Sequence, residues 1–270
     1  VLFRSASPPP IGPWVTPARI KPTADLAARR LVVIDMGGGN DGLNMVPPIG
    51  SGRYHQLRAR VALDDAEILP IALGVGLHPS LPRLHAAGAA IVQGVGVTRP
   101  DLSHFEMLRR WWAGDADSAH VSLTGFLGRL ADRVGDATAP AVGVSLGYGP
   151  SPALVAQRVT TLSMDPYGEG KFPAPAGLDA AAAWTTAWKA MAELDPDEAA
   201  PFCSARNGAA YAYRFSQLAG GLPAAATGYP QTELGAQLLL AARLLGQDNG
   251  VRVVHVPFHG DFDKIGRAHV

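Results

Sequence analysis

The feature that most limits the fold of this chain is a set of short apolar runs, each followed by glycine or polar residues. Leu31–Asp35 is apolar and β-branched, and it leads directly into the glycine-rich segment Gly37–Asn44. An apolar run without alternation is typical of a strand that is buried on both faces of a parallel sheet. Similar runs at Ala89–Val97, Ala141–Leu146 and Val251–Val256 predict three further strands.

Helical stretches separate these runs. One helix is expected to follow a cap at Asp101 or Ser103, to run through Trp112 and to end at Gly114. The clearest helix is Thr232–Gly246, whose leucines and alanines keep to helical spacing. Other helices are predicted over Leu81–Ala87, Leu178–Leu194 and Ala209–Leu218. Strands that alternate with helices predict an α/β fold with a mainly parallel sheet.

Composition excludes several classes of protein. The 23 basic residues balance 23 acidic ones, which argues against a nucleic acid or an anionic membrane as partner. Apolar residues make up 47% of the chain, enough for a packed core. Cys203 is the only cysteine, so a disulfide within the chain and a cysteine metal cluster are both excluded. Nothing predicts a transmembrane segment, because no apolar stretch approaches the required length of about 18 residues.

The two ends of the sequence share an unusual property. Lys264–Val270 can be encoded by AAGATCGGAAGAGCACACGTC, which contains the string AGATCGGAAGAGCAC. Val1–Ser5 can be encoded by the reverse complement of that string, and the string resembles a sequencing adaptor. We therefore expect residues 1–5 and 264–270 to be adaptor-derived and the natural chain to extend further at both ends. Residues 6–30 are predicted to be an extended lead-in to a domain at 31–263, with an irregular helical insertion at 165–230.

The first motif follows the first predicted strand. Gly37–Gly42 satisfies the spacing of a dinucleotide-binding loop, but Pro47 and Pro48 are expected to prevent the helix which that loop requires. The remaining feature is a carboxylate pair, Asp35 and Asp41, at the carboxyl end of a central strand. Such carboxylates suit a divalent cation. The alternative is that Asp41 makes only turn hydrogen bonds.

The second motif, Asp101–Glu106, places Ser103 and His104 at the start of a predicted helix. A hydroxyl at a helix N-terminus suits a nucleophile that attacks phosphate or sulfate, or a clamp for an anion. The alternative is an ordinary N-cap serine, with His104 packed beside the tryptophans of the helix.

The third motif follows the last predicted strand and contains His255, His259, Asp261 and Asp263. Aspartate and histidine at the carboxyl end of a strand are common ligands of zinc and similar ions, whereas a solvent-facing polar loop is the competing interpretation. Three polar clusters after three different strands together predict a metal-assisted site.

These motifs also support a family resemblance. Leu31–Asn44 strongly resembles the opening of the bacterial family called domain of unknown function 1501. Gly76–Pro79, Ala90–Gly96, Ser103–Phe105 and Asp261–Asp263 resemble its other hallmarks and occur in the family's order, so the resemblance covers Leu31 to Asp263. That family is similar to a branch of the alkaline phosphatase and sulfatase superfamily, and its members are typically exported by the twin-arginine route.

The resemblance implies an alkaline-phosphatase-like three-layer α/β/α sandwich, incomplete at the C-terminus, with divalent metal ions such as zinc. Asp41, or less directly Asp35, would bind one metal ion, and Asp263 matches the aspartate of the family's Phe-Asp-Thr-His motif. Ser103 corresponds to the nucleophile, although aligning Trp111 and Gly114 puts His104 at that position.

The resulting expectation is an exported metal-dependent hydrolase, periplasmic or secreted, that acts on phosphate or sulfate esters of small molecules or polymers. The 270-residue form itself is expected to be inactive, because the resemblance places further ligands beyond it. The alternative is a non-catalytic binding or surface-assembly protein that uses the same fold.

Overall fold

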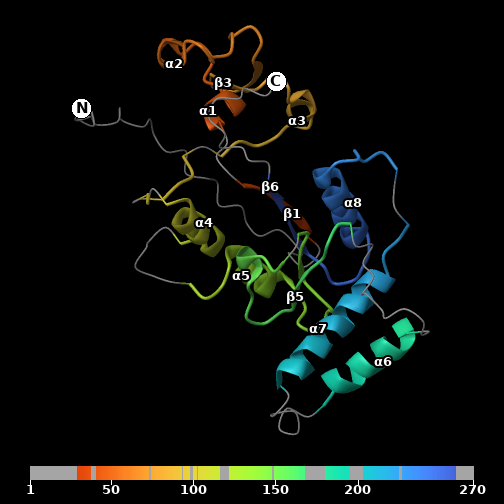
Figure 1. Ribbon diagram of the computed structural model, residues 1–270. Helices are drawn as coiled ribbons and strands as arrows, with labels where there is room; N and C mark the ends of the chain where they lie inside the picture. The colour runs from red at the N-terminus through yellow and green to blue at the C-terminus, as the bar shows by residue number, and fades with distance from the viewer. Residues whose placement is uncertain are drawn as a thin grey trace.

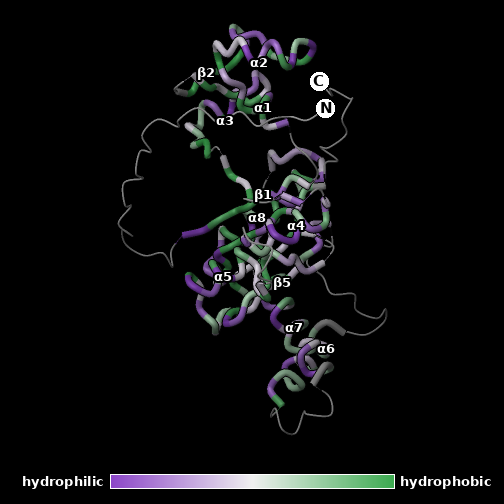
Figure 2. Tube along the Cα trace, turned by 90° about the vertical axis from the view of Figure 1, so that its left-hand side faces the viewer, coloured by the Kyte–Doolittle hydropathy of each residue, from purple (hydrophilic) through white to green (hydrophobic). Residues whose placement is uncertain are grey.

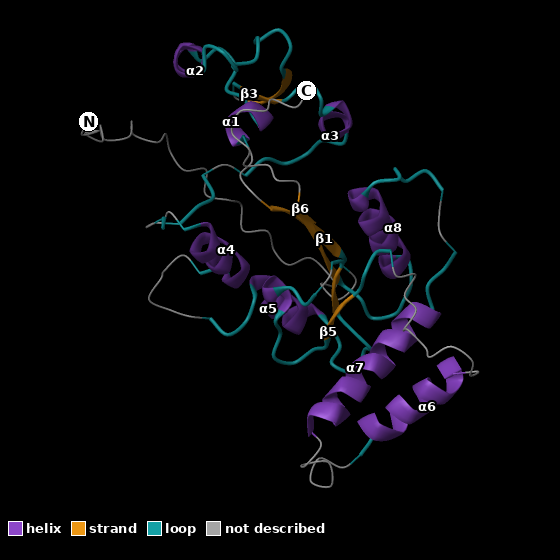
Figure 3. Ribbon diagram, viewed as in Figure 1, coloured by secondary structure: helices purple, strands orange, loops and turns teal. Residues whose placement is uncertain are grey.

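The main sheet of the protein has four strands in the order β1-β6-β4-β5, and every neighbouring pair is parallel (Figures 1 and 3). These strands are β1 (Leu31–Gly37), β4 (Gly143–Ser145), β5 (Thr161–Ser163) and β6 (Val253–His259). A separate antiparallel pair consists of β2 (Leu69–Ala72) and β3 (Val75–Leu77). The computed structural model describes residues 29–37, 41–72, 74–92, 94–97, 100–101, 103–115, 122–147, 149–167, 180–194, 203–224 and 227–259.

Strand β6 lies between two strands that precede it in the sequence. Leu31 to Gly37 of β1 pair with Val253 to His259, and on the other side Ser145 of β4 pairs with His255. Because all four strands are parallel, their carboxyl ends meet at one edge of the sheet. The polar residues at the ends of β1, β4 and β6 are therefore brought together.

One face of the sheet packs on two long helices. Val144, Leu146, Val254 and Val256 are fully buried there. They pack in one cluster with side chains of α7 (Cys203–Gly220) and α8 (Glu233–Leu245).

The opposite face is covered by a second helical layer. Val142 and Val253 pack against Leu127 and Ala131 of α5 (Phe126–Val134), and Trp112 from α4 (His104–Ala113) joins this cluster. Successive residues along a strand thus pack against opposite helical layers, as the two-residue period of a strand requires. The predicted α/β fold, with a mainly parallel sheet between helical layers, is confirmed.

The predicted helices are present. Thr232–Gly246 corresponds to α8, whose N-cap Thr232 accepts a hydrogen bond from the N–H of Gly235 at 3.1 Å. The other four are α3 (Pro82–Ala86), α4, α6 (Ala180–Ala192) and α7, which begins six residues earlier than the apolar spacing indicated. Helices α6 and α7 lie side by side below the sheet in Figure 1, inside the segment that was expected to be an irregular insertion.

The strand predicted at Ala89–Val97 is wrong for the residues of it that the structure describes, since none of them is in a strand. Val92 is 79% exposed and Val95 61% exposed, so these side chains do not pack into a core. Gly94 has a φ of +70°, which interrupts an extended backbone. An apolar run becomes a strand only when a neighbouring strand pairs with it, and sequence alone does not supply that partner.

The strand predicted at Leu31–Asp35 is confirmed as β1, but its expected central position and its burial on both faces are wrong. Among the described strands β1 pairs only with β6, so it is an edge strand. Val32 and Ile34 are 39% and 45% exposed, whereas their register partners Val254 and Val256 are fully buried.

Residues 41–86 form a small region beyond the carboxyl end of β1, seen at the top of Figures 1 and 2. It contains α1 (Gly42–Met45), α2 (Gly52–Leu57), the β2–β3 pair and α3. The expectation that Pro47 and Pro48 leave no helix here is wrong, because α1 completes one turn before them. In the described part of the chain, no helix combines the length and apolarity that crossing a membrane requires.

Candidate functional site

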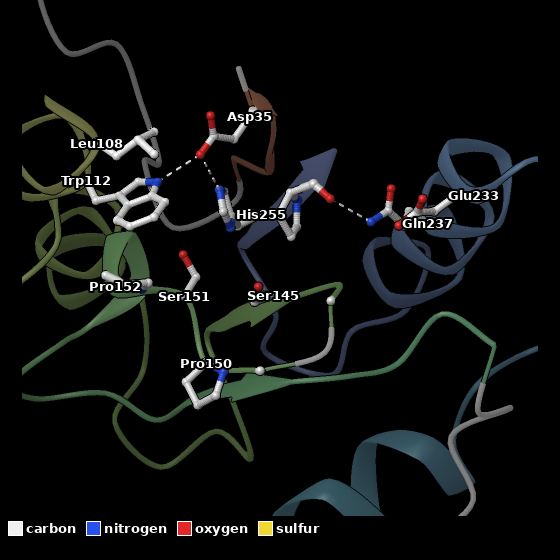
Figure 4. A pocket seen from close by; sticks show the side chains of 14 residues that line it. Asp35, Leu108, Trp112, Ser145, Pro150, Ser151, Pro152, Glu233, Gln237 and His255 are labelled. Carbon is white, nitrogen blue, oxygen red and sulfur yellow. Dashed lines mark hydrogen bonds and ion pairs between the residues drawn. The ribbon is translucent and has the colours of Figure 1, made fainter. Parts of the chain in front are cut away.

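A cavity of about 360 Å³ lies at the carboxyl ends of β1, β6 and β4 (Figure 4). Ligands of parallel α/β sheets commonly bind at this edge, and the volume is within the usual range for small-molecule sites. Helix α4 contributes one wall and α8 another, while the 3₁₀ turn η2 (Pro152–Leu154) adds Pro152. The cavity is lined by Asp35, Gly37, Leu108, Trp112, Ser145, Gly147, Gly149, Pro150, Ser151, Pro152, Glu233, Gln237, His255 and Pro257.

Asp35 and His255 form the polar centre of this site. They occupy the same face of adjacent strands, because His255 pairs with Val33 and Asp35 lies two residues further along β1. His255 Nε2 is 3.5 Å from Asp35 Oδ2, and the same oxygen accepts a hydrogen bond from Trp112 Nε1 at 2.9 Å. One carboxylate therefore fixes both an imidazole and an indole (Figure 4).

Three buried polar atoms around the cavity lack a hydrogen-bond partner: Ser145 Oγ, Gln237 Oε1 and His255 Nδ1. In the described part of the chain, the only other buried side-chain atom in this state is Arg58 Nε. Native proteins leave few such atoms unpaired, since each costs about 1–3 kcal/mol. Their concentration around one cavity indicates that a bound ligand or ordered water completes their hydrogen bonding.

The amide of Gln237 has a fixed orientation. Its Nε2 donates to the carbonyl oxygens of Leu146 and Pro257, both at 2.9 Å, and so links α8 to the ends of β4 and β6. A rotated amide would place Oε1 against these two oxygens. The unpaired atom is therefore the acceptor Oε1.

Asp41 performs the local role that was considered as the alternative to metal binding. It is the N-cap of α1, and its Oδ1 accepts a hydrogen bond from the N–H of Asn44 at 3.2 Å. Its other carboxylate oxygen is paired with Arg58. Asp41 is not among the residues that line the cavity, so the structure does not bring it together with Asp35 there.

Ser103 is likewise a helix cap. Its hydroxyl accepts a hydrogen bond from the N–H of Glu106 at 3.4 Å, and neither Ser103 nor His104 lines the cavity. Trp112, near the other end of the same helix, does reach the cavity. At about 1.5 Å per residue, roughly 13 Å of helix axis separates it from Ser103. The predicted nucleophile is therefore not among the residues that line the cavity of the Asp35–His255 pair.

The first turn of α4 also carries negative charge. Glu106 binds Arg109 through two hydrogen bonds of 2.8 and 2.7 Å, and Arg110 through one of 2.9 Å. These bonds, those from Arg109 first, lower the pKa of Glu106 to about 2. Arg109 and Arg110 neutralise the charge of Glu106, so this carboxylate is committed to ion pairs within α4.

The remaining predicted ligands lie at the end of the described chain. His259 is the last residue of β6, and its backbone is in register with Gly37 at the edge that holds the cavity. Asp263 and Asp261 lie outside the described residues. Within the described residues, no three histidine, cysteine, aspartate or glutamate side chains are grouped so that they could hold a metal ion.

Sequence reasoning found Asp35 and His255 but missed three other residues of the cavity. Ser145 and His255 both interrupt apolar strands, and a polar residue inside such a run is a usable signal. Gln237 and Trp112 carry no comparable signal, because each lies on a helix and meets its partners only through the fold.

Comparison with known proteins adds no assignment: no family model, no curated protein and no solved structure matches the chain. The resemblance to domain of unknown function 1501 therefore stays a prediction that depends on the motifs.

Proposed function

We propose that this protein is a hydrolase of phosphate or sulfate esters whose reaction centre is the Asp35–His255 cavity. The observation that carries the proposal is the Asp35–His255 pair itself, at the carboxyl edge of a parallel sheet. In this pair His255 is buried, Asp35 is partly buried, and Nδ1 of His255 has no hydrogen-bond partner. The ester class, the dependence on metal and an exported, periplasmic or secreted location come from the family resemblance.

The residues present fit a divalent ion such as zinc in one respect. A metal-binding histidine usually turns its second nitrogen toward a carboxylate, which holds the ring in place. His255 has this arrangement, with Nε2 toward Asp35 and Nδ1 unpaired. His255 would hold the ion. The motifs suggest two further ligands, His259 as the last residue of β6 and Asp263, which lies outside the described residues. Asp35 then orients His255 instead of binding the metal directly.

The charge of the cavity explains why a cation is needed. Asp35 and Glu233 line it, and among the described residues that line it there is no lysine or arginine. An anionic ester would be repelled by these carboxylates unless a positive charge lies between them. A bound divalent ion supplies that charge and can activate a nucleophile. The chain contributes Trp112 and Leu108, which exclude water from one wall.

The test measures zinc affinity for the 270-residue chain, and turnover of aryl phosphates and sulfates both by this chain and by the longer protein that the family resemblance implies. We expect His255→Ala to abolish both, and Asp35→Asn to weaken zinc binding by about 10–100-fold. His85→Ala, at an exposed histidine bonded to the Pro70 carbonyl, is the matched control. Turnover that is lost in Ser103→Asp but kept in His255→Ala would contradict the proposal. It would place the reaction centre at Ser103, at the start of α4.

A specific observation also favours a binding protein without catalysis. Asp41 and Ser103, two residues central to the predicted hydrolytic site, both serve as helix caps. A folded full-length protein with neither zinc binding nor turnover would establish this second candidate.

A further inference from the structure

The cavity at the sheet edge presents hydrogen-bond acceptors and negative charge. Asp35 and Glu233 supply carboxylates, and Gln237 supplies an amide oxygen. None of the lining residues that the structure describes is a lysine or an arginine. A ligand that suits this set donates hydrogen bonds and carries positive charge.

Gln237 makes this preference specific. The side chain is 1% exposed, and both of its N–H donors are used by the Leu146 and Pro257 carbonyls. Its Oε1 therefore cannot be exchanged for a donor by rotation of the amide, and it is left without a partner. Ser145 Oγ, also 1% exposed and unpaired, is a second polar atom among the residues that line the cavity.

The rest of the wall is apolar and aromatic. Leu108, Pro150 and Pro152 line it together with Trp112, whose position is set by the hydrogen bond from its indole N–H to Asp35. An indole ring attracts an organic cation through its electron-rich face, and the prolines and leucine suit a small hydrocarbon body. In Figure 4, Leu108, Trp112 and Pro152 lie on one side of His255, and Glu233 and Gln237 lie on the other.

We propose that the cavity is a binding site for an organic ammonium ion, namely a primary amine on a small aromatic or aliphatic body. Glu233 and Asp35 balance the charge of the ammonium group, and Gln237 Oε1 accepts one of its N–H bonds. The proposal uses the cavity of the proposed hydrolase, but it requires neither a metal ion nor turnover.

The experiment uses the 270-residue chain after treatment with a chelator, and isothermal titration at pH 7 with benzylamine and benzyl alcohol. The two probes have the same body, but only the amine is charged. We expect benzylammonium to bind at least about tenfold more tightly, because hydrogen bonds to charged groups are the stronger ones. Benzyl alcohol that binds equally well, or benzylamine that does not bind, would overturn the proposal.

Variants then assign the binding to the named residues. Gln237→Leu removes the fixed acceptor, and we expect about a tenfold loss of benzylamine affinity. Glu233→Gln keeps the side-chain shape and should cost about two- to fivefold. Glu193→Gln is the matched control on the 66%-exposed carboxylate beside Lys189, where no change is expected.

Two further readouts separate this inference from other outcomes. Gln237→Leu also loses two structural hydrogen bonds, so circular dichroism is used to check that this variant folds. If Gln237→Leu does not fold, Glu233→Gln tests the proposal in its place. Unchanged benzylamine affinity in a folded Glu233→Gln variant contradicts the role of its charge. Zinc affinity and aryl phosphate turnover, measured in parallel, report on the hydrolase alone, so the two proposals can fail independently.

Discussion

Individual carboxylates in this protein have different roles, and the role of Asp132 is structural. Its two oxygens accept hydrogen bonds from the backbone N–H groups of Gln157, Arg158 and Val159 at 2.9, 2.7 and 3.0 Å. Desolvation raises the pKa of Asp132, but these three N–H groups together lower it below the ordinary value of 3.8. The ionised carboxylate therefore joins α5 to the loop that leads into β5.

Asp132→Asn should lower the free energy of unfolding by about 2 kcal/mol at pH 7, since one N–H group would then face an amide that cannot accept its bond. Because the folded pKa is depressed, the stability that Asp132 contributes is fully present above its unfolded pKa and disappears as pH falls through the folded value. Urea denaturation at pH 7 and pH 3 measures this difference. Asp248→Asn, at a 93%-exposed side chain, is the control. A difference that grows toward pH 3 would contradict this account.

For single residues, the sequence indicated Asp35 as a site residue but not the side chains that Asp35 contacts. A carboxylate after a β-branched run already suggested a site at the end of a strand. Trp112, however, is 77 residues away from Asp35 in sequence, and Gln237 is 91 residues away from the Leu146 carbonyl that it binds. Contacts over such separations depend on the packing of whole elements, and a single sequence does not contain that information directly.

Helix α4 is an element whose ends were readable from sequence. Ser103 caps its start, and Gly114, with a φ of +67°, ends it in the left-handed conformation that glycine favours. These signals are local, since each acts within one turn of the helix. The failed strand at Ala89–Val97 depended on a neighbour instead, which explains why helices were predicted better than strands.

Replacing Ser103 separates its capping role from a chemical one. We expect Ser103→Ala to lower the free energy of unfolding by about 1 kcal/mol, because the N–H of Glu106 loses its acceptor. Ser103→Asp should restore stability, since aspartate caps helices as well as serine does. Thermal and urea unfolding of the two variants measure both effects. Equal stability of the alanine and aspartate variants would mean that the cap contributes nothing.

Across the whole molecule the sheet is unevenly covered. Buried clusters lie on both faces of β6, through Val253 on one face and Val254 and Val256 on the other, whereas β1 leaves Val32 and Ile34 substantially exposed at the edge. Paired positions in the same sheet therefore differ in how much apolar area each removes from water.

Val32 and Val254 are register partners, so they allow a direct comparison. Val254→Thr places a hydroxyl in a fully buried cluster, and we expect a loss of about 2 kcal/mol in the free energy of unfolding. Val32→Thr, at a 39%-exposed position, should cost about 0.5 kcal/mol or less. Guanidinium denaturation of both variants gives the comparison. Equal losses would show that β1 is covered in solution.

The central place of β6 also affects how the protein is made. This strand joins β1 to β4, yet it is the last described element of the chain. At about 5–20 residues per second, a ribosome needs roughly ten seconds or more to reach Val253 after Leu31 has been added. During that time β1 lacks β6, the only strand that pairs with it in the described part of the chain. The sheet can close only after β6 has been synthesised, so β1 depends on a partner strand that is made long after it.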